Sequence, residues 1–524
     1  MRAVLLSILG LILISAGVLW EGETKLKPKH RKTFEMAEFH FGAEDFIESE
    51  KQYRILVEHY PMDGYFHFKL GYSLFELKRL EESIHHFQKA LQHDLQEAHF
   101  YLARANHRIE NFEEAEKHYK IYGNFSEKLK TDATVKAHLK AVQRAKEAYS
   151  NPVEVRISNA GQAINSTFED YVPLISADGD QLVFTSKRPD QTWKKDKFSD
   201  ELFEDIFVAT KVNGNWESAV QLAAPVNSPY HDANVCFSAD GKSLILYRND
   251  KHRGNGDLFL AEYVNGLWGE PVKLPESINS KYHEPSAALS PNGDRMYLVS
   301  DRPGSLGDRD IFLLNKLPNG EWSKPINLGK TVNTKFNEDA PFVEPNGNYL
   351  YFASEGHNSI GGFDIFRSKI LSDGTLGTPE NMGYPINSVQ DDIYFSITKD
   401  GKKAYYSSLK IKDTNGEQDI YEIDFLFEKQ DHVVVKGKVL NAKNDPVEAR
   451  VELKDEKGKL IQTINAAPET GNFLLSVIPD RKYKITAHHD GYEFHEEWIE
   501  PKIARKGEFS ILKLNIILKE KRHE

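Results

Sequence analysis

One hairpin turn recurs five times along the middle of the chain. It first occurs as SADGDQLVFTSKR from Ser176, where an Asp-Gly pair precedes alternating apolar residues. An Asp-Gly or Asn-Gly pair between two such runs is the strongest local signal for a tight hairpin. Further copies follow after steps of 62, 52, 54 and 54 residues, at Ser238, Ser290, Glu344 and Thr398. A hairpin repeated at this period limits the region to architectures built from repeated small sheets.

Other markers recur at fixed places around each turn. Eleven residues before it stands the asparagine of an Asn-Ser or Asn-Thr pair, namely Asn165, Asn227, Asn279, Asn333 and Asn387. After it comes a triplet such as Asp-Ile-Phe, which begins at Asp205, Asp257, Asp310, Asp364 and Asp419. Five periods of about four strands each predict a five-bladed β-propeller, with six blades as the alternative.

The sequence also predicts how this ring closes. After Asp419 the fifth copy has no outer strand of its own, whereas the region opens with VEVRISNAGQAINS from Val153. We expect this first strand to complete the last blade, because closure removes the free sheet edges that invite aggregation. The repeat resembles the TolB-like and WD-type propeller repeats of bacterial envelope proteins, from Pro152 to Phe425, and we assign the domain to residues 152–428.

An acidic residue stands five residues after each repeated asparagine. One acid per blade, next to the strand expected to be innermost, would form a ring at the mouth of the central channel. Such a ring could hold a cation or the basic end of a peptide. The alternative is that each acid caps its own turn or pairs with an arginine such as Arg188 or Arg302, the commoner role of such carboxylates. The five acids are Asp170, Asp232, Glu284, Glu338 and Asp392.

Residues 30–150 have apolar residues at helical spacing, and the pattern repeats after 34 and then 32 residues. This is the period of a helix-turn-helix array. The copy FHFKLGYSLFELKRLEESIHHFQKAL from Phe66 resembles a tetratricopeptide repeat, with Leu70-Gly71 and Ala90 at the expected places. We expect a capping helix over 131–149, and we expect the His85-His86 pair on a solvated surface.

The resemblance to tetratricopeptide repeats implies a concave groove that grips peptides or partner helices. Aligned copies place aromatic residues and one histidine at positions that face this groove in the family. The alternative is that these side chains pack between neighbouring helices, as buried aromatics commonly do. The candidate groove residues are Phe34, Phe41, Phe68, Tyr72, Phe75, Phe100 and His107.

Residues 432–520 continue the alternation without the blade markers. About seven short strands with a turn every ten residues or so predict a small β-sandwich. The order of Val435-x-Gly437-x-Val439 and later Gly491-Tyr492 resembles the carboxypeptidase regulatory-like domain. That resemblance implies an immunoglobulin- or prealbumin-like packing module without chemistry of its own. The whole chain is therefore predicted to be a multidomain protein with one helical and two all-β parts.

The first 21 residues contain an apolar run from Ala3 to Trp20. Such a run is an export signal or a single membrane anchor, and membrane association would occur through it. The formal net charge of −12 argues against nucleic-acid binding. No nucleophile elbow, phosphate-binding glycine loop or metal-ligand triad occurs. We therefore expect no enzyme, no catalytic residue, no metal and no cofactor.

The module order, after an export signal, resembles that of the PorE-like envelope proteins of Bacteroidetes. In that family a C-terminal OmpA-like domain that grips peptidoglycan follows, and its absence here argues against direct peptidoglycan binding. The resemblance implies a scaffold that docks envelope proteins or peptides and is linked to type IX secretion or outer-membrane organisation. It would lie in the periplasm, on the periplasmic face of the outer membrane, or anchored in the inner membrane.

The alternative function is a ligand- or cation-binding propeller. Such a protein would act as a sensor or would bind carbohydrate or peptide, and it would use the five acids of the channel mouth.

Overall fold

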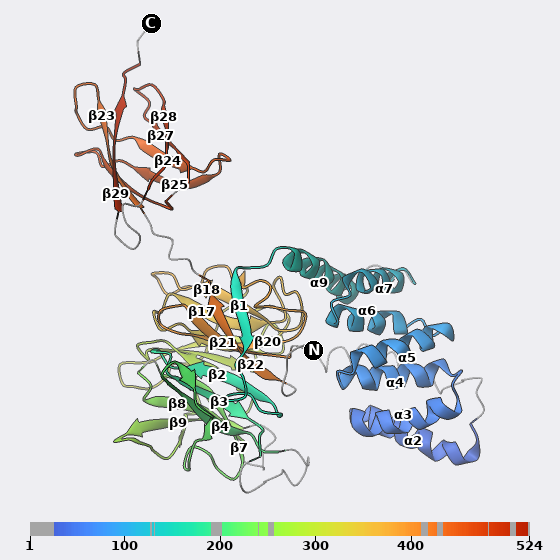
Figure 1. The fold of residues 1–524 in the computed structure, drawn as a ribbon. Helices are drawn as coiled ribbons and strands as arrows, with labels where there is room; N and C mark the ends of the chain where they lie inside the picture. Colours follow the sequence, from blue (N-terminus) through green and yellow to red (C-terminus); the bar gives the residue numbers. More distant parts are fainter. Residues whose placement is uncertain are drawn as a thin grey trace. The chain divides into compact units, whose positions relative to one another are not determined.

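The computed structural model describes residues 26–125, 128–129, 132–189, 202–238, 240–249, 256–409, 418–426, 433–479, 481–502 and 510–521. It divides into two compact units, Met1–Leu426 and Phe427–Glu524. The first unit holds the helices and five small sheets, and the second holds two more sheets (Figure 1). The apolar run from Ala3 to Trp20 lies outside the described residues. None of the described helices has the length and hydropathy that a membrane span requires.

Where the structure describes it, the helical part contains three helix pairs and the longer helix α9. Asp45 and Asp63 cap two of the helices by accepting hydrogen bonds from the backbone N–H groups of Glu48 and Phe66. Gly71 allows α4 and α5 to pack closely, because a Cβ there would lie 3.0 Å from the Phe87 ring. The helices are α2 (Pro28–Gly42), α3 (Phe46–His59), α4 (Gly64–Glu76), α5 (Leu80–Gln92), α6 (Ala98–Arg108), α7 (Phe112–Asn124) and α9 (Ala133–Ser150).

The five sheets are the five predicted blades. In each, three main strands pair antiparallel, and a short or distant strand adds to the edge. The blades contain β2 (Asp170–Ile175), β3 (Gln181–Ser186), β4 (Asp205–Val212), β5 (Asn215–Trp216) and β6 (Val220–Gln221); β7 (His231–Phe237), β8 (Ser243–Asn249), β9 (Asp257–Val264), β10 (Leu267–Trp268) and β11 (Val272–Lys273); β12 (Ala287–Leu289), β13 (Arg295–Ser300), β14 (Asp310–Asn315) and β15 (Ile326–Asn327); β16 (Glu338–Val343), β17 (Tyr349–Ser354), β18 (Asp364–Lys369) and β19 (Glu380–Asn381); and β20 (Asp392–Ile397), β21 (Lys403–Ser408) and β22 (Asp419–Phe425).

The ring closes as the sequence predicts. Strand β1 (Val155–Asn159) pairs antiparallel with β22, so that the first strand becomes the outer strand of the last blade. Val155 lies opposite Phe425, and Asn159 lies opposite Tyr421. The closing strand buries part of Ile157 against the core of that blade.

The repeated asparagines join neighbouring blades. Each uses its side-chain amide to bind both backbone groups of one residue in the third strand of the preceding blade. Asn165 donates to the carbonyl of Ile420 at 2.8 Å and accepts from its N–H at 2.9 Å. Asn227, Asn279, Asn333 and Asn387 do the same to Ile206, Leu258, Ile311 and Ile365. The asparagine of the repeat is therefore a connector between sheets.

Helix α9 packs on the propeller as well as on the helical array. Val135 and Val142 belong to the helical core, whereas Ala145 packs with Ile360 and Val389 of the propeller. The ring of Tyr149 stacks on Tyr384 with centroids 3.8 Å apart. The Arg144 guanidinium and the Gln390 amide bind backbone carbonyls across the contact, those of Ser359 and Arg108 respectively. We call this contact the joint.

The second unit is a β-sandwich of a three-stranded and a four-stranded sheet, with buried valine, leucine and isoleucine side chains between them. Gly437 leaves room for the Phe473 ring of the neighbouring strand in the same sheet, because a Cβ there would lie 2.1 Å from that ring. The strands are β23 (Val433–Asn441), β24 (Arg450–Lys454), β25 (Leu460–Asn465), β26 (Asn472–Val477), β27 (Tyr483–His488), β28 (His495–Ile499) and β29 (Ser510–Leu518).

Candidate functional site

The candidate groove residues lie on α2, α4 and α6, the first helices of the three pairs. Four of them, Phe34, Phe41, Phe68 and Tyr72, are half-buried and keep part of their surface open to solvent. The other three are buried: Phe75 is 0%, Phe100 is 3% and His107 is 7% exposed. These three side chains therefore pack between neighbouring helices, as the alternative prediction had it. They are not available to a partner.

Three of the half-buried aromatics form one row across α2 and α4, beside the buried Tyr101 of α6. The Tyr72 ring lies between Phe41 and Tyr101, with centroids 5.2 and 4.9 Å away. Phe68 approaches the same Tyr101 ring at 5.6 Å. We call Phe41, Phe68 and Tyr72 the aromatic row, because each side chain is fixed by its neighbour while part of it faces solvent.

Charged groups border the aromatic row at both ends. Next to the first pair, the ammonium of Lys69 on α4 lies 3.6 Å from the Phe41 ring centroid and 3.6 Å from the Glu38 carboxylate. Burial lowers the pKa of this lysine. On the third pair, the Arg104 and Arg108 guanidinium groups lie 4.7 and 4.9 Å from the Phe75 ring centroid. The row thus runs from a paired acid and lysine to two arginines.

The five acids are buried in the turns of their own blades. Glu284, 2% exposed, accepts from the Ser280 N–H at 3.0 Å and from the Ser280 hydroxyl at 2.7 Å. It also accepts from the Ser300 hydroxyl and pairs with Arg302 at 2.9 Å. Asp170 and Asp232 have the same kind of contacts with Ser166 and Arg188, and with Ser228 and Arg248.

Two blades lack the arginine. Glu338 accepts from the Thr334 N–H, the Thr334 hydroxyl and the Ser354 hydroxyl, and Gly356 stands where the third blade has Arg302. Burial raises the pKa of Glu338 to about 7. Asp392 accepts from Ser388 and from the Ser408 hydroxyl.

These contacts correct the hypothesis of a ligand-binding ring. Asp170, Asp232, Glu284, Glu338 and Asp392 are between 0% and 2% exposed, and their oxygens are occupied by serine, threonine and arginine donors of the repeat. Each acid caps its own turn, as the alternative prediction had it. No three His, Cys, Asp or Glu side chains gather as a metal site within the described part of the chain.

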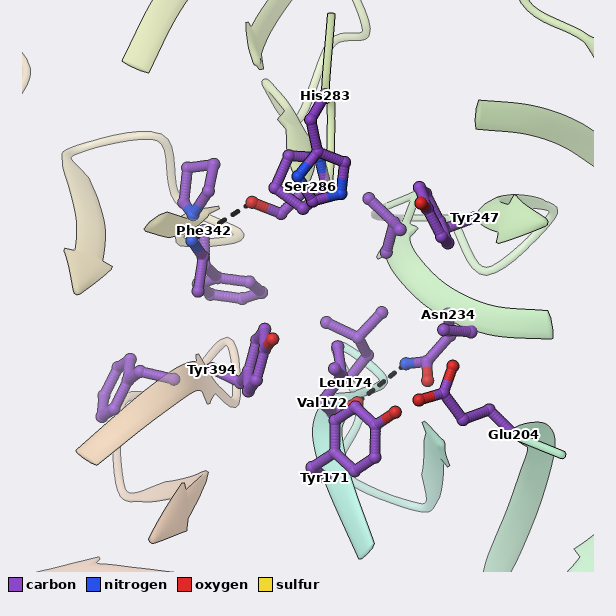
Figure 2. A pocket seen from close by; sticks show the side chains of 16 residues that line it. Tyr171, Val172, Leu174, Glu204, Asn234, Tyr247, His283, Ser286, Phe342 and Tyr394 are labelled. Atoms are coloured by element: carbon purple, nitrogen blue, oxygen red, sulfur yellow. Dashed lines mark hydrogen bonds between the residues drawn. The ribbon is translucent and has the colours of Figure 1, made fainter. Parts of the chain in front are cut away.

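A cavity of about 160 Å³ lies on the propeller axis instead (Figure 2). Strands β2, β7, β16 and β20 and the residues just before β12 line it, so all five blades contribute. The lining residues include those one or two places after each repeated acid: Tyr171, Val172, Ala233, Asn234, Pro285, Ser286, Ala340 and Tyr394. These residues were not predicted from the sequence. Their fixed distance from the acids of the repeat is the signal that would have found them.

The inner strands are bent where they line the cavity. The pairing of β2, β16 and β20 with their neighbours shifts at Tyr171/Leu174, Asp339/Phe342 and Ile393/Ser396. At these β-bulges Val172, Ala340 and Tyr394 adopt left-handed φ values of 51°, 49° and 60°. Non-glycine residues rarely adopt this conformation, and bulges re-aim the side chains beside them.

Comparison with known proteins gives partial matches. Residues 64–95 match the family model of the tetratricopeptide repeat. Comparison with curated proteins gives no match. Among solved structures, the putative TolB from Agrobacterium tumefaciens is similar to the chain with 16% identity and a TM-score of 0.31, covering 62% of this chain and 97% of that one.

Two further solved structures are similar to a smaller share of the chain. The Yersinia enterocolitica type III secretion chaperone SycD, in complex with a peptide of the translocator YopD, has 16% identity and a TM-score of 0.21, and the match covers 23% of this chain and 97% of that one. The TPR2B domain of yeast Sti1, in complex with pHsp70, has 14% identity and a TM-score of 0.21, and the match covers 22% of this chain and 98% of that one.

Proposed function

We propose that this protein is a non-enzymatic scaffold that binds a partner polypeptide along the aromatic row of its helical array. The observation that carries the proposal is the row itself. Phe41, Phe68 and Tyr72 are held at defined places on two neighbouring helices, yet none of them is fully buried. Aromatic side chains that are fixed before binding lose little conformational entropy when a partner covers them.

The charges beside the row favour an extended segment or an amphipathic helix as the partner. Apolar side chains would cover Phe68 and Tyr72, and acidic side chains would face Arg104 and Arg108 beyond them. Arrays of this kind commonly bind their partners through such grooves.

We further propose that the scaffold works in the cell envelope, with an exported chain and a role in type IX secretion or outer-membrane organisation. The apolar run from Ala3 to Trp20 and the order of the three modules support this proposal. The run would serve either as a cleaved signal or as an anchor.

Photo-crosslinking tests the binding surface. A photo-reactive residue at Phe68 is compared in the native host with one at Ile55, a 41% exposed residue of the second helix α3. We expect one envelope protein to be captured at Phe68 and not at Ile55, and a Tyr72→Ala exchange to weaken that capture about tenfold or more. Equal capture at both positions, or none at Phe68, would contradict the proposal.

A further inference from the structure

The cavity on the propeller axis has the size of a small organic group. Its volume of about 160 Å³ corresponds to roughly five water molecules, at a share of ~30 Å³ each. A four-carbon chain ending in one polar group fits such a space, whereas a sugar chain or a folded peptide does not. The ligand is therefore a small molecule or a single side chain.

Aromatic rings make up much of the cavity wall. Tyr171, Tyr247, Phe342 and Tyr394 line it from four different blades, together with Phe395. The Tyr171 and Tyr394 rings are neighbours, with centroids 6.1 Å apart. Figure 2 shows Tyr394 and Tyr171 beside the space between the inner strands. The faces of such rings attract aliphatic chains and cations alike.

One carboxylate gives the wall its charge. Glu204 lines the cavity, and in Figure 2 its carboxylate points toward the Tyr171 hydroxyl. Burial acts to raise the pKa of Glu204, but hydrogen bonds from the side chains of His231 and Tyr171 and the charges of Lys187 and His231 hold it below the usual value, so the carboxylate is ionised at neutral pH. The His231 Nδ1 lies 3.6 Å from the carboxylate, outside the cavity lining. Burial lowers the pKa of the nearby His283, which is therefore mostly neutral.

The rest of the lining offers no opposing charge. None of the sixteen described lining residues is a lysine or an arginine. Asp339, just outside the lining, is paired with Arg309 at 2.6 Å and accepts from the Ser286 hydroxyl. The cavity thus combines one negative charge with aromatic walls, which is the combination that recognises an organic cation.

The backbone around the cavity is strained. Val172, Ala340 and Tyr394 hold left-handed φ values within strands, a conformation that costs free energy for a residue other than glycine. This strain recurs at the same place in three blades, where it shapes the wall. Strain that is kept in this way clusters at binding sites.

We propose that the cavity binds an aliphatic ammonium group, with its positive charge against Glu204 and its carbon chain against Tyr171 and Tyr394. The group would belong either to a free small amine or to a lysine side chain of a partner protein. This inference stands apart from the proposed function, because no residue of the aromatic row lines the cavity.

Calorimetric titration of the full chain tests the proposal. The probes are n-butylammonium, its neutral isostere 1-butanol, and N-acetyl-lysine methylamide as a lysine side chain with blocked backbone groups. We expect saturable binding of butylammonium and at least tenfold weaker binding of butanol. Binding of the blocked lysine as tightly as butylammonium would assign the site to a partner's lysine, and binding of butylammonium alone would assign it to a free amine.

Variants of the lining residues test whether the probe binds in this cavity. Glu204→Gln should weaken butylammonium binding at least tenfold, whereas Glu217→Gln, at an exposed glutamate of the same propeller, should leave it unchanged. Tyr394→Leu, which keeps the Glu204 carboxylate, should weaken butylammonium binding about threefold or more. This variant tests the proposal if Glu204→Gln fails to fold. No binding at millimolar probe, or equal binding by Glu204→Gln, Tyr394→Leu and the wild type, would overturn the proposal.

Discussion

The carboxylates of Glu284 and Glu338 occupy equivalent places in neighbouring blades, and their surroundings differ by one arginine. Both accept hydrogen bonds from a Ser or Thr at the start of the turn and from a serine of the second strand. Only Glu284 has an arginine, Arg302, at 2.9 Å. A buried carboxylate without a cation retains its proton to higher pH, because burial disfavours the charged form.

We predict that Glu338→Gln flattens the pH dependence of stability. The pKa of Glu338 is about 7 in the folded protein against a reference value of 4.5. Between these values the folded protein holds a proton that the unfolded chain has released, so stability falls as pH rises from 4.5 to 7. Urea unfolding at pH 5 and pH 8 should show the variant gaining roughly 3 kcal/mol on the wild type between the two.

Glu284→Gln is the matched control for this prediction. It removes the partner of Arg302 and leaves a buried guanidinium uncompensated, so it should destabilise the protein at both pH values. Parallel pH profiles of Glu338→Gln and the wild type would show that Glu338 does not titrate in this range.

At the residue scale, the sequence predicted where the repeated residues lie in the fold better than it predicted which side chains surround them. The repeat predicted the positions of all five acids, and the alternative of capped turns followed from ordinary turn chemistry. The burial of His86 was not predicted, because a polar pair on a helix usually faces water. In the structure His86 is 8% exposed and its Nδ1 lies 2.9 Å from that of His67. Their sequence separation of 19 residues spans two helices, and single-helix periodicity does not report such a contact.

Among the elements, the asparagine connectors offer a matched pair. Asn165 and Asn333 make equivalent hydrogen bonds, to both backbone groups of Ile420 and of Ile311 and to the side chains of Asn159 and Asn327. Asn333 joins blades that are adjacent in sequence, whereas Asn165 joins the first blade to the last. Of the two, only the contact of Asn165 joins segments about 255 residues apart in the sequence.

We predict that Asn165→Leu opens the ring and that Asn333→Leu does not. Each exchange leaves a buried N–H and C=O without their partner, at about 1–3 kcal/mol per group. After Asn333→Leu the short connection still holds the blades together, because closing a short loop costs little entropy. Hydrogen exchange should therefore accelerate across β1 and β22 in Asn165→Leu but only locally at β14 in Asn333→Leu. Equal, local effects would contradict the prediction.

At the element scale, repetition made the sequence informative. Five copies of one turn fixed the number of blades and the closure by β1, because each marker could be compared with four others. The bulges at Val172, Ala340 and Tyr394 were not predicted, since nothing in the local sequence distinguishes them from regular strand residues. The repeat could have given the positions that line the cavity, but not its shape, which depends on those bulges.

For the whole molecule, the joint couples the helical array to the propeller. The stacked rings of Tyr149 and Tyr384 lie beside the apolar contact of Ala145 with Ile360 and Val389. The sequence predicted α9 as a capping helix but not its second contact. The propeller residues involved lie in loops outside the repeat markers, and the hydrogen bond from Arg144 joins residues 215 positions apart.

We predict that Tyr149→Ala separates the melting of the two parts. Loss of the stacked ring should weaken the joint by about 1–3 kcal/mol. Of the six tryptophans, Trp20 lies in the N-terminal apolar run and the other five follow residue 150, so tryptophan fluorescence follows mainly the β-sheet parts while circular dichroism at 222 nm follows the helices. The two thermal transitions should coincide in the wild type and in Phe39→Ala, an exchange at a 71% exposed side chain of α2, and should differ in Tyr149→Ala. Coinciding transitions in Tyr149→Ala would show that the joint does not couple the parts.

The closing strand pair also determines how the propeller bears a mechanical load. The chain enters the propeller at Val155 and leaves it at Phe425, and these two residues are direct partners in the β1–β22 pair. In an antiparallel pair the hydrogen bonds lie across the strands. Tension applied to the chain on both sides would therefore pull Val155 and Phe425 directly apart. The hydrogen bonds between β1 and β22 would then break one after another, starting at this pair. The β1–β22 pair, which closes the ring, is thus also the place where a small sustained force opens it first.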